Sequence, residues 1–315
     1  MVYVFLILGL VLLVAGGESF VRGSVAIARR LGMSPLLIGL TLMGFGTSLP
    51  EMVTSVQAAL DGAPGIAMGN VVGSNIANIL LILGVAAVLY PVAVDRGVLR
   101  RDGGVLVLSA LVTLAIVLIG ALGRIAGIVL IAMLAAYITR SYLAERQSNI
   151  ARDAEEESAH TAVRNGVAVS LILAAVGLGL TLLGARFLVS SAIELATAFG
   201  ISETVIGLTV VAVGTSLPEL VTSVIAAVRK HTDLALGNII GSNIFNTFAI
   251  LGVTALVQPI PVPAEIIRLD IWIMLAATVG LIAFAYTARR IERWEGAVFL
   301  LAYAGYIGWL GLSAL

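Results

Sequence analysis

The chain has 315 residues, of which 60% are hydrophobic and 11% are charged, and its mean hydropathy is +1.11. A soluble globular domain carries about 25% charged residues, so this composition indicates an integral membrane protein. The net charge is zero and there is no cysteine, which excludes a basic nucleic-acid-binding surface, a disulfide framework and a cysteine-based metal site.

Ten apolar stretches are long enough to cross a bilayer as helices, since a spanning helix needs about 20 residues. The first stretch lacks the basic start of a secretory signal, so we expect a retained membrane helix. The predicted fold class is an all-α membrane protein with ten transmembrane helices. In chain order the stretches occupy residues 2–28, 35–60, 66–90, 105–122, 125–143, 167–199, 205–228, 234–257, 269–286 and 297–315.

Two charged residues within the first stretch, Glu18 and Arg22, are four residues apart and therefore share one helical face. A charge inside a membrane usually has a partner, so we expect an ion pair with a structural role.

The second and seventh stretches contain the same six residues, Gly-Thr-Ser-Leu-Pro-Glu, at 46–51 and 214–219. Proline has no N–H and displaces the carbonyl four residues before it, so each copy predicts a helix break. Freed carbonyls, hydroxyls and a carboxylate are hard oxygen donors, which suit Ca²⁺ or Na⁺. An ionisable residue at bilayer depth indicates a functional site, so Glu51 and Glu219 are the leading candidates. The alternative is a proline kink whose Glu is paired or reaches the interface.

The third and eighth stretches share a second motif, Gly-Asn-x-x-Gly-Ser-Asn-x-x-Asn, at 69–78 and 237–246. Its second, sixth and tenth positions lie on one helical face, so each copy predicts a polar stripe. Small and amide residues also hold membrane helices together, which makes helix packing the alternative. The stripe residues are Asn70, Ser74 and Asn78 in the first copy and Asn238, Ser242 and Asn246 in the second.

Each second copy lies 168 residues after its first occurrence (219 minus 51), which divides the chain into two halves. We expect a first five-helix repeat at 1–144, a cytoplasmic linker at 145–165 and a second five-helix repeat at 166–315. Because five is odd, the repeats would be inverted. Placing the loops on alternate sides puts fourteen Lys and Arg on one side and two on the other. The positive-inside rule then places both termini outside.

With these motifs the sequence resembles the cation/Ca²⁺ exchanger superfamily, and most closely its prokaryotic Na⁺/Ca²⁺ antiporter branch. The resemblance covers the whole chain in helix number and repeat layout. It implies four ion sites near the middle of the membrane, formed by helices 2, 3, 7 and 8, while helices 1 and 6 slide across that core. It also implies a multi-pass monomer in the lipid bilayer of a prokaryotic inner (plasma) membrane, with no enzyme activity, no nucleic-acid partner and no cofactor besides the transported Ca²⁺ and Na⁺.

The resemblance also implies a set of ion-binding positions when its motifs are carried over residue by residue. The Ca²⁺ ligands would be the Glu51 and Glu219 carboxylates with the backbone oxygens of Thr47 and Thr215. Some archaeal members carry Asp at the position of Asn246, so here only two carboxylates belong to the motifs, which leaves proton coupling open. The remaining positions are Ser48, Ser74, Ser216, Ser242, Asn78, Asn246 and the backbone oxygens of Gly44 and Ala212.

The sequence favours a secondary antiporter in which inward movement of Na⁺ expels Ca²⁺. A Ca²⁺/H⁺ antiporter is the alternative, in which Glu51 and Glu219 carry the protons. An intramembrane hydrolase would need a nucleophile with its base or a carboxylate dyad, and would not explain the duplicated hydroxyl and amide stripes. A passive channel would need a run of pore-lining carbonyls, which the sequence does not indicate.

Overall fold

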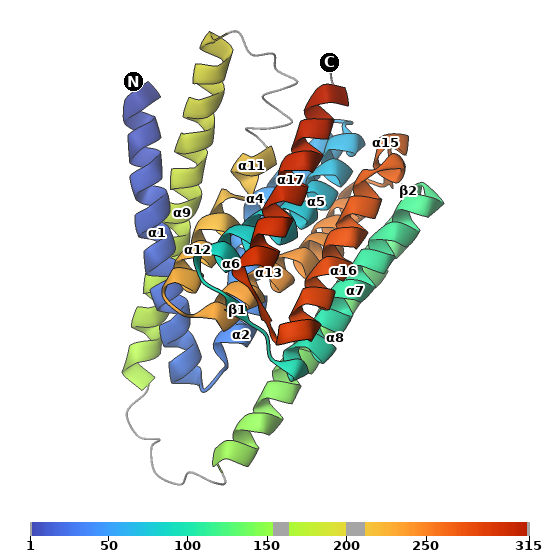
Figure 1. Ribbon diagram of the computed structural model, residues 1–315. Coiled ribbons are helices and arrows are strands. Elements are labelled where there is room, and N and C mark those ends of the chain that lie inside the picture. Colours follow the sequence, from blue (N-terminus) through green and yellow to red (C-terminus); the bar gives the residue numbers. More distant parts are fainter. Residues whose placement is uncertain (1, 154–163, 200–211, 314–315) are drawn as a thin grey trace.

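The computed structural model is a bundle whose long helices run roughly in one direction (Figure 1), and it describes residues 2–153, 164–199 and 212–313. In these residues eight helices are long and apolar enough to span a membrane, and the bent pair at 35–60 makes a ninth. Ten were predicted. The seventh, 205–228, starts outside the described residues, and its second part forms the apolar helix Leu217–Val228.

The described elements follow one another as the apolar pattern predicts, and three of the spans in this part of the chain contain a short π-helical segment (η). The first half contains α1 (Val2–Leu31), α2 (Pro35–Ile38), η1 (Gly39–Met43), α3 (Gly44–Thr47), α4 (Leu49–Leu60), α5 (Pro64–Ala77), η2 (Asn78–Leu83), α6 (Gly84–Leu89), α7 (Arg96–Ile119) and α8 (Arg124–Asp153). The second half contains α9 (Arg164–Ala198), α11 (Ala212–Thr215), α12 (Leu217–Val228), α13 (Thr232–Phe245), η4 (Asn246–Ile250), α14 (Leu251–Val257), α15 (Ala264–Arg268), α16 (Asp270–Ala288) and α17 (Arg293–Ser313).

Some helices extend beyond their predicted apolar stretches because hydropathy detects only the apolar part of a helix. α7 starts at Arg96 and not at 105, since the Asp95 carboxylate accepts a hydrogen bond from the N–H of Gly97 at 2.6 Å and caps the helix. The predicted linker 145–165 is partly helical, because α8 continues to residue 153 and α9 begins at residue 164. Good helix formers such as Ala, Glu, Arg and Gln extend α8 past its apolar part.

Two short antiparallel strand pairs, which were not predicted, join loops of the two halves. β1 (Val92–Ala93) pairs with β4 (Arg290–Ile291), and β2 (Ala121–Leu122) pairs with β3 (Ile260–Pro261). Two residues are too few to show an alternating pattern, so only tertiary contact defines these strands.

The most buried span among the described residues is the one formed by α13, η4 and α14, with 89% of its apolar window inside the protein. It crosses η1 and α2 at backbone contact. A Cβ on Gly237 would lie 2.5 Å from the carbonyl oxygen of Leu36, and one on Gly241 would lie 2.5 Å from that of Leu40. Only glycine permits so close an approach. This crossing brings the second motif of one half beside the first motif of the other.

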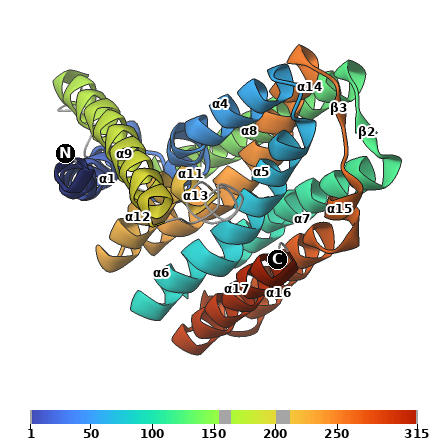
Figure 2. The ribbon, with the colours of Figure 1, turned by 90° about the horizontal axis from the view of Figure 1, so that it is seen from above.

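Helices α1 and α9 lie side by side at one edge of the bundle (Figure 2). Their backbones also touch at glycines. A Cβ on Gly16 would lie 2.5 Å from the nitrogen of Thr181, and one on Gly177 would lie 2.3 Å from the nitrogen of Phe20. Small residues allow such contact between membrane helices, so α1 and α9 form one tightly packed pair.

Candidate ion-binding site

Both copies of the first motif interrupt a helix at their serine. α3 ends at Thr47 and α4 begins at Leu49, with a bend of 42° between the two helices of this span. Ser48 has a ψ of 5°, and Ser216, between α11 and α12, has a ψ of 6°. A proline follows each serine by two residues and has no N–H to continue the helical ladder. The breaks predicted from the two prolines are therefore present.

The two carboxylates of these motifs are buried and are held crosswise. Glu51 and Glu219 are 1% and 2% exposed and lie in the first turn of α4 and α12. The hydroxyl of Ser48 donates to Glu219 Oε1 at 3.0 Å, and the hydroxyl of Ser216 donates to Glu51 Oε1 at 3.2 Å. Each serine thus contacts the glutamate of the other copy, so the structure brings four predicted residues from both halves into one cluster.

Four buried oxygens at predicted ligand positions have no hydrogen-bond partner within the described residues. They are Glu51 Oε2, Glu219 Oε2, Asn78 Oδ1 and Asn246 Oδ1. A buried acceptor without a partner is costly, so it needs an explanation. α4 packs against η4 and α12 against η2, so each Glu helix contacts the segment that begins with the Asn of the other copy. Carboxylate and amide oxygens are ligands that Ca²⁺ and Na⁺ prefer.

Both amides of this set start a π-helical segment. η2 begins at Asn78 and η4 begins at Asn246, at the same place in the two motif copies. Such segments interrupt the regular α-helical spacing of side chains and occur frequently at functional sites. The sequence predicted the two asparagines and missed the π-helical geometry, for which the duplicated Asn is the only signal.

Two further predicted positions meet directly. The hydroxyl of Ser242 donates to the backbone oxygen of Gly44 at 3.4 Å, which joins α13 to α3. The hydroxyl of Thr47 contacts the Met43 carbonyl at 3.0 Å and Asn238 Oδ1, in α13, at 3.4 Å. That Thr47 offers its backbone oxygen to an ion stays a prediction.

The other three predicted positions are Ser74, Thr215 and Ala212. Ser74 is 4% exposed, and its backbone oxygen accepts the backbone N–H of Asn78. Thr215 is half-buried at the end of α11. Ala212 begins α11, and only its backbone is described.

Asn70 and Asn238, which occupy the same position in the two motif copies, hydrogen-bond to neighbouring helices. The amide of Asn70 donates to the backbone oxygen of Glu51 at 3.0 Å and to the hydroxyl of Ser55 at 2.9 Å. In the second copy the amide of Asn238 donates to the hydroxyl of Ser223 at 2.9 Å. These contacts tie α5 to α4 and α13 to α12, which favours the packing interpretation for both residues.

The predicted ion pair in α1 is present and has a third member. Arg22 Nε contacts Glu18 Oε1 at 2.5 Å, and Arg229 Nε, at the end of α12, contacts Glu18 Oε2 at 3.2 Å. The contact with Arg229 joins residues 211 positions apart, which helical spacing cannot predict.

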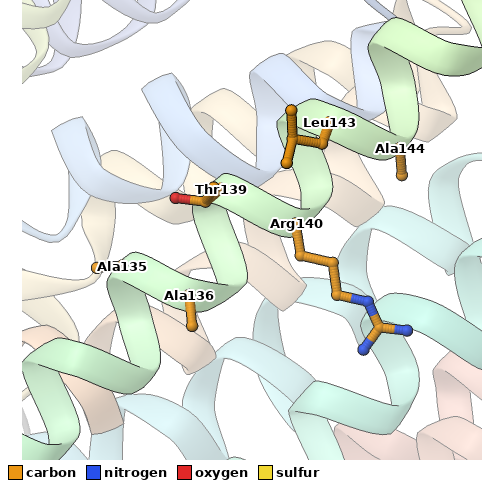
Figure 3. A pocket seen from close by; sticks show the side chains of 6 residues that line it. All are labelled: Ala135, Ala136, Thr139, Arg140, Leu143 and Ala144. Carbon is orange, nitrogen blue, oxygen red and sulfur yellow. The ribbon is translucent and has the colours of Figure 1, made fainter.

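A separate cavity of about 580 Å³ lies on the surface of α8 (Figure 3). All its lining residues come from this one helix, and Arg140 is their only charged side chain. The cavity shares no residue with the predicted ion-binding set. Its lining consists of Ala135, Ala136, Thr139, Arg140, Leu143 and Ala144.

Comparison with known proteins identifies relatives over nearly the full chain. The sequence profile of the sodium/calcium exchanger protein family matches residues 1–143 and 169–312. The sodium/calcium exchanger MaX1 of Methanosarcina acetivorans is 35% identical, over 97% of both chains. The inner membrane protein YrbG of Escherichia coli K12 is 37% identical, over 98% of this chain and 95% of YrbG. The solved structure of the sodium–calcium exchanger NCX_Mj soaked with 10 mM Na⁺ has a TM-score of 0.85 at 36% identity, covering 98% of this chain and 99% of that one.

Proposed function

Because this chain belongs to the sodium/calcium exchanger family, we propose that it is a secondary active antiporter that exchanges Na⁺ for Ca²⁺ by alternating access. The main support is the set of four buried oxygens, from both motif copies, that have no hydrogen-bond partner in the described residues. Relatives named as a sodium/calcium exchanger and as an inner membrane protein support a prokaryotic inner (plasma) membrane as its site of action.

Ion competition for one set of oxygens would couple the two fluxes. Two ionised carboxylates match the charge of one Ca²⁺, and hydroxyl, amide and backbone oxygens can complete the six to eight ligands that Ca²⁺ takes. Na⁺ prefers the same hard oxygens. A cation at the glutamate oxygens would replace the serine O–H donors, whose oxygens would then turn lone pairs toward the ion. Since Na⁺ and Ca²⁺ cannot fill the cluster together, each change between the outward-open and inward-open states carries either Na⁺ or Ca²⁺.

We assign Ca²⁺ to the carboxylates of Glu51 and Glu219 with the backbone oxygens of Thr47 and Thr215. The crosswise Ser–Glu contacts support this assignment because both carboxylates belong to one cluster. These side chains come from one chain, which supports function as a monomer. The Na⁺ and amide positions are Ser48, Ser74, Ser216, Ser242, Asn78, Asn246 and the backbone oxygens of Gly44 and Ala212.

The proposed topology has ten spans in two inverted repeats, 1–144 and 166–315, joined by a cytoplasmic segment at 145–165. The equal offset of both helix breaks and of both π-helical starts supports the repeat. The first turn of α1 and the last turn of α17 lie at the same end of the bundle (Figure 1), as an even number of crossings requires.

Strand pairing supports the tenth span independently. Five helices long enough to span a membrane lie in the described residues between β1 and its partner β4. Paired strands lie on one side of the membrane, which requires an even number of crossings between them. A sixth crossing is therefore needed, and residues 205–228 are the apolar stretch that can supply it. The β2–β3 pair, with three such helices in the described residues between its strands, leads to the same requirement.

The test is uptake of radioactive Ca²⁺ by sealed proteoliposomes that contain the purified protein. We expect uptake when Na⁺ is present inside and absent outside, and none when Na⁺ is equal on both sides. An outward proton gradient without Na⁺ should drive no uptake.

Two other results would contradict this function. Uptake driven by the proton gradient alone would replace Na⁺ by H⁺ as the coupling ion. Uptake that needs no opposing ion, and that follows only the membrane potential, would identify a channel.

A further inference from the structure

Asn75 of the first half contacts Asn246 of the second half in the protein interior. The amide nitrogen of Asn246 donates to Asn75 Oδ1 at 3.1 Å, while the amide nitrogen of Asn75 donates to the hydroxyl of Thr247 at 3.3 Å. The same nitrogen lies 3.7 Å from the sulfur of Met274. Asn75, Asn246 and Thr247 are at most 3% exposed. Their polar groups therefore have few possible hydrogen-bond partners other than one another.

The chemistry of the partners gives this chain of hydrogen bonds one direction. Thr113 donates its single proton to the backbone oxygen of Ser109 at 2.9 Å, and that carbonyl can only accept. The contact of 3.2 Å between the hydroxyls of Thr113 and Thr247 must then use the proton of Thr247. Thr247 is left as an acceptor, so Asn75 turns its NH₂ group toward it. Met274 agrees with this orientation because a thioether sulfur is only an acceptor.

The direction determines which end of Asn246 is used for this contact. Since the oxygen of Asn75 faces Asn246, Asn246 must present its NH₂ group there. Its Oδ1 is consequently the free end, and it is one of the four buried oxygens without a partner in the described part of the chain. A cation coordinates the oxygen of an amide and is repelled by the NH₂ hydrogens.

We propose that Asn75 is a positioning residue for ion binding: with Thr247 and Thr113 behind it, it holds Asn246 so that the carbonyl oxygen, and not the NH₂ group, is available to the transported ion. The inference rests on the proposed function, because it concerns the same ion cluster. It adds a residue that the motif-based ligand set does not contain.

Within the described residues, no corresponding chain of hydrogen bonds leads to the first-half amide, Asn78. Asn243 occupies the position that corresponds to Asn75, 168 residues later, yet its amide donates to the backbone oxygen of Ile239 at 2.7 Å, within its own helix. The positions that correspond to Thr113 and Thr247 are Leu281 and Ile79, which have no hydroxyl. Orientation by a hydrogen-bond chain is therefore specific to Asn246, and Asn243 provides a matched control.

The experiment measures Na⁺-driven Ca²⁺ uptake in proteoliposomes, with the Ca²⁺ concentration at half-maximal rate separated from the maximal rate. Loss of a residue that orients a ligand typically lowers metal affinity by about 10- to 100-fold. We expect Asn75→Ala to raise the half-maximal Ca²⁺ concentration by this factor. Thr247→Val removes a hydroxyl that contacts Asn75 and Thr113, and should change it in the same direction by less. Asn243→Ala should leave it within about twofold of the wild type.

A double-mutant cycle separates positioning from general packing. A carboxylate has two equivalent oxygens, so orientation loses its importance in Asn246→Asp. The Asn75→Ala change should therefore have little effect on half-maximal Ca²⁺ when it is added to Asn246→Asp. Coupling between two residues in contact is what such a cycle measures. If Asn246→Asp gives no uptake, the same four proteins are compared by the thermal stabilisation that Ca²⁺ produces in detergent.

The outcomes distinguish this inference from the proposed function. A wild-type protein without Na⁺-driven uptake refutes the function itself. Uptake by the wild type combined with unchanged Ca²⁺ affinity in Asn75→Ala refutes only the positioning role. An equal loss in both backgrounds, or an equal loss in Asn243→Ala, assigns Asn75 to packing and also overturns the inference. A loss confined to the Asn246 background supports it.

Discussion

Glu51 and Glu219 have no basic partner among the described residues. In this they differ from Asp102, a buried carboxylate where α7 contacts α8. Asp102 is fully buried but is contacted by Arg101 at 2.9 Å and by the hydroxyl of Tyr137 at 3.2 Å. In the described chain the side-chain partners of the two glutamates are hydroxyls, that of Ser216 for Glu51 and those of Ser48 and Thr47 for Glu219. A buried charge needs compensation. A permanent Arg suits Asp102, whereas a transported cation suits the two glutamates.

This contrast predicts the effect of neutralising each glutamate. Glu51→Gln and Glu219→Gln should each abolish Na⁺-driven Ca²⁺ uptake, because an amide removes one of the two charges that bind a divalent ion. The thermal midpoint of unfolding in detergent should not fall, since a neutral side chain is less costly to bury.

Glu295→Gln is the matched control for this prediction. Glu295 is also 2% exposed, but its carboxylate accepts the backbone N–H of Glu292 at 2.7 Å at the start of α17. This variant should transport at the wild-type rate. Near-native uptake by either Glu51→Gln or Glu219→Gln would show that the ions bind elsewhere.

The serine hydroxyls test how Na⁺ and Ca²⁺ share the cluster. Ser48→Ala and Ser216→Ala should raise the Na⁺ concentration needed for half-maximal Ca²⁺ uptake by about 3- to 10-fold, the value of one neutral polar contact. Exchange of Ca²⁺ for Ca²⁺ should change less, because the carboxylates supply most of its binding. Ser24→Ala, which removes a buried hydroxyl of α1 outside the motifs, serves as the control. Equal losses in both exchange modes would mean that these serines bind both ions.

A site residue can be predicted from the sequence when it is repeated in the two halves of the chain. Glu51, Ser48 and their copies could be found because identical residues recur at one offset inside apolar stretches. The hydrogen-bond chain from Thr113 to Asn246 could not, because Thr113 and Thr247 have no hydroxyl counterpart in the other half and the contacts join separate spans. Contacts of this kind depend on how the helices cross and not on any local pattern.

At the level of helices, the apolar pattern located the membrane spans and the prolines located their breaks, whereas the extensions of α7 and α8 beyond the apolar residues were missed. The π-helical segments were also missed, since no residue type specifies them. The α1–α9 contact can be predicted only in part. Glycines at one face of an apolar helix indicate close packing, but not which helix is the partner.

The glycine contact between α1 and α9 predicts a sharp difference between two substitutions. Gly16→Val should lower stability by about 1–3 kcal/mol, because its side chain would enter the backbone of α9, 2.5 Å from the nitrogen of Thr181. Gly179→Val should have little effect, since Gly179 is exposed and a Cβ there meets no atom of the described residues within 4 Å. Thermal unfolding in detergent measures both. Equal midpoints for the two variants would mean that α1 and α9 are not packed through this seam.

For the whole molecule, the decisive property is the number of times the chain crosses the membrane. The arginine and lysine distribution and the two strand pairs are separate observations, and both support the proposal that residues 205–228 cross once. In the proposed topology the loops at 61–63 and 120–123 lie outside, and the loops at 90–95 and 289–292 lie inside.

The absence of cysteine from the chain makes this topology directly testable, because a single introduced thiol is the only reactive one. Ser148→Cys, in the last part of α8, should react with a membrane-impermeant maleimide only after the cytoplasmic side is opened. Asp61→Cys should react in intact cells. It is a better probe than Gly62, whose φ of 75° favours glycine. One span, Pro64–Leu89, separates Asp61 from the loop that holds β1, and two spans, α7 and α8, separate that loop from Ser148, so the proposal places Ser148 inside and Asp61 outside when the basic loops are cytoplasmic. Reaction of Ser148→Cys in intact cells, with Asp61→Cys protected, would reverse the orientation of the whole exchanger, and reaction of both from one side would refute the ten-span topology.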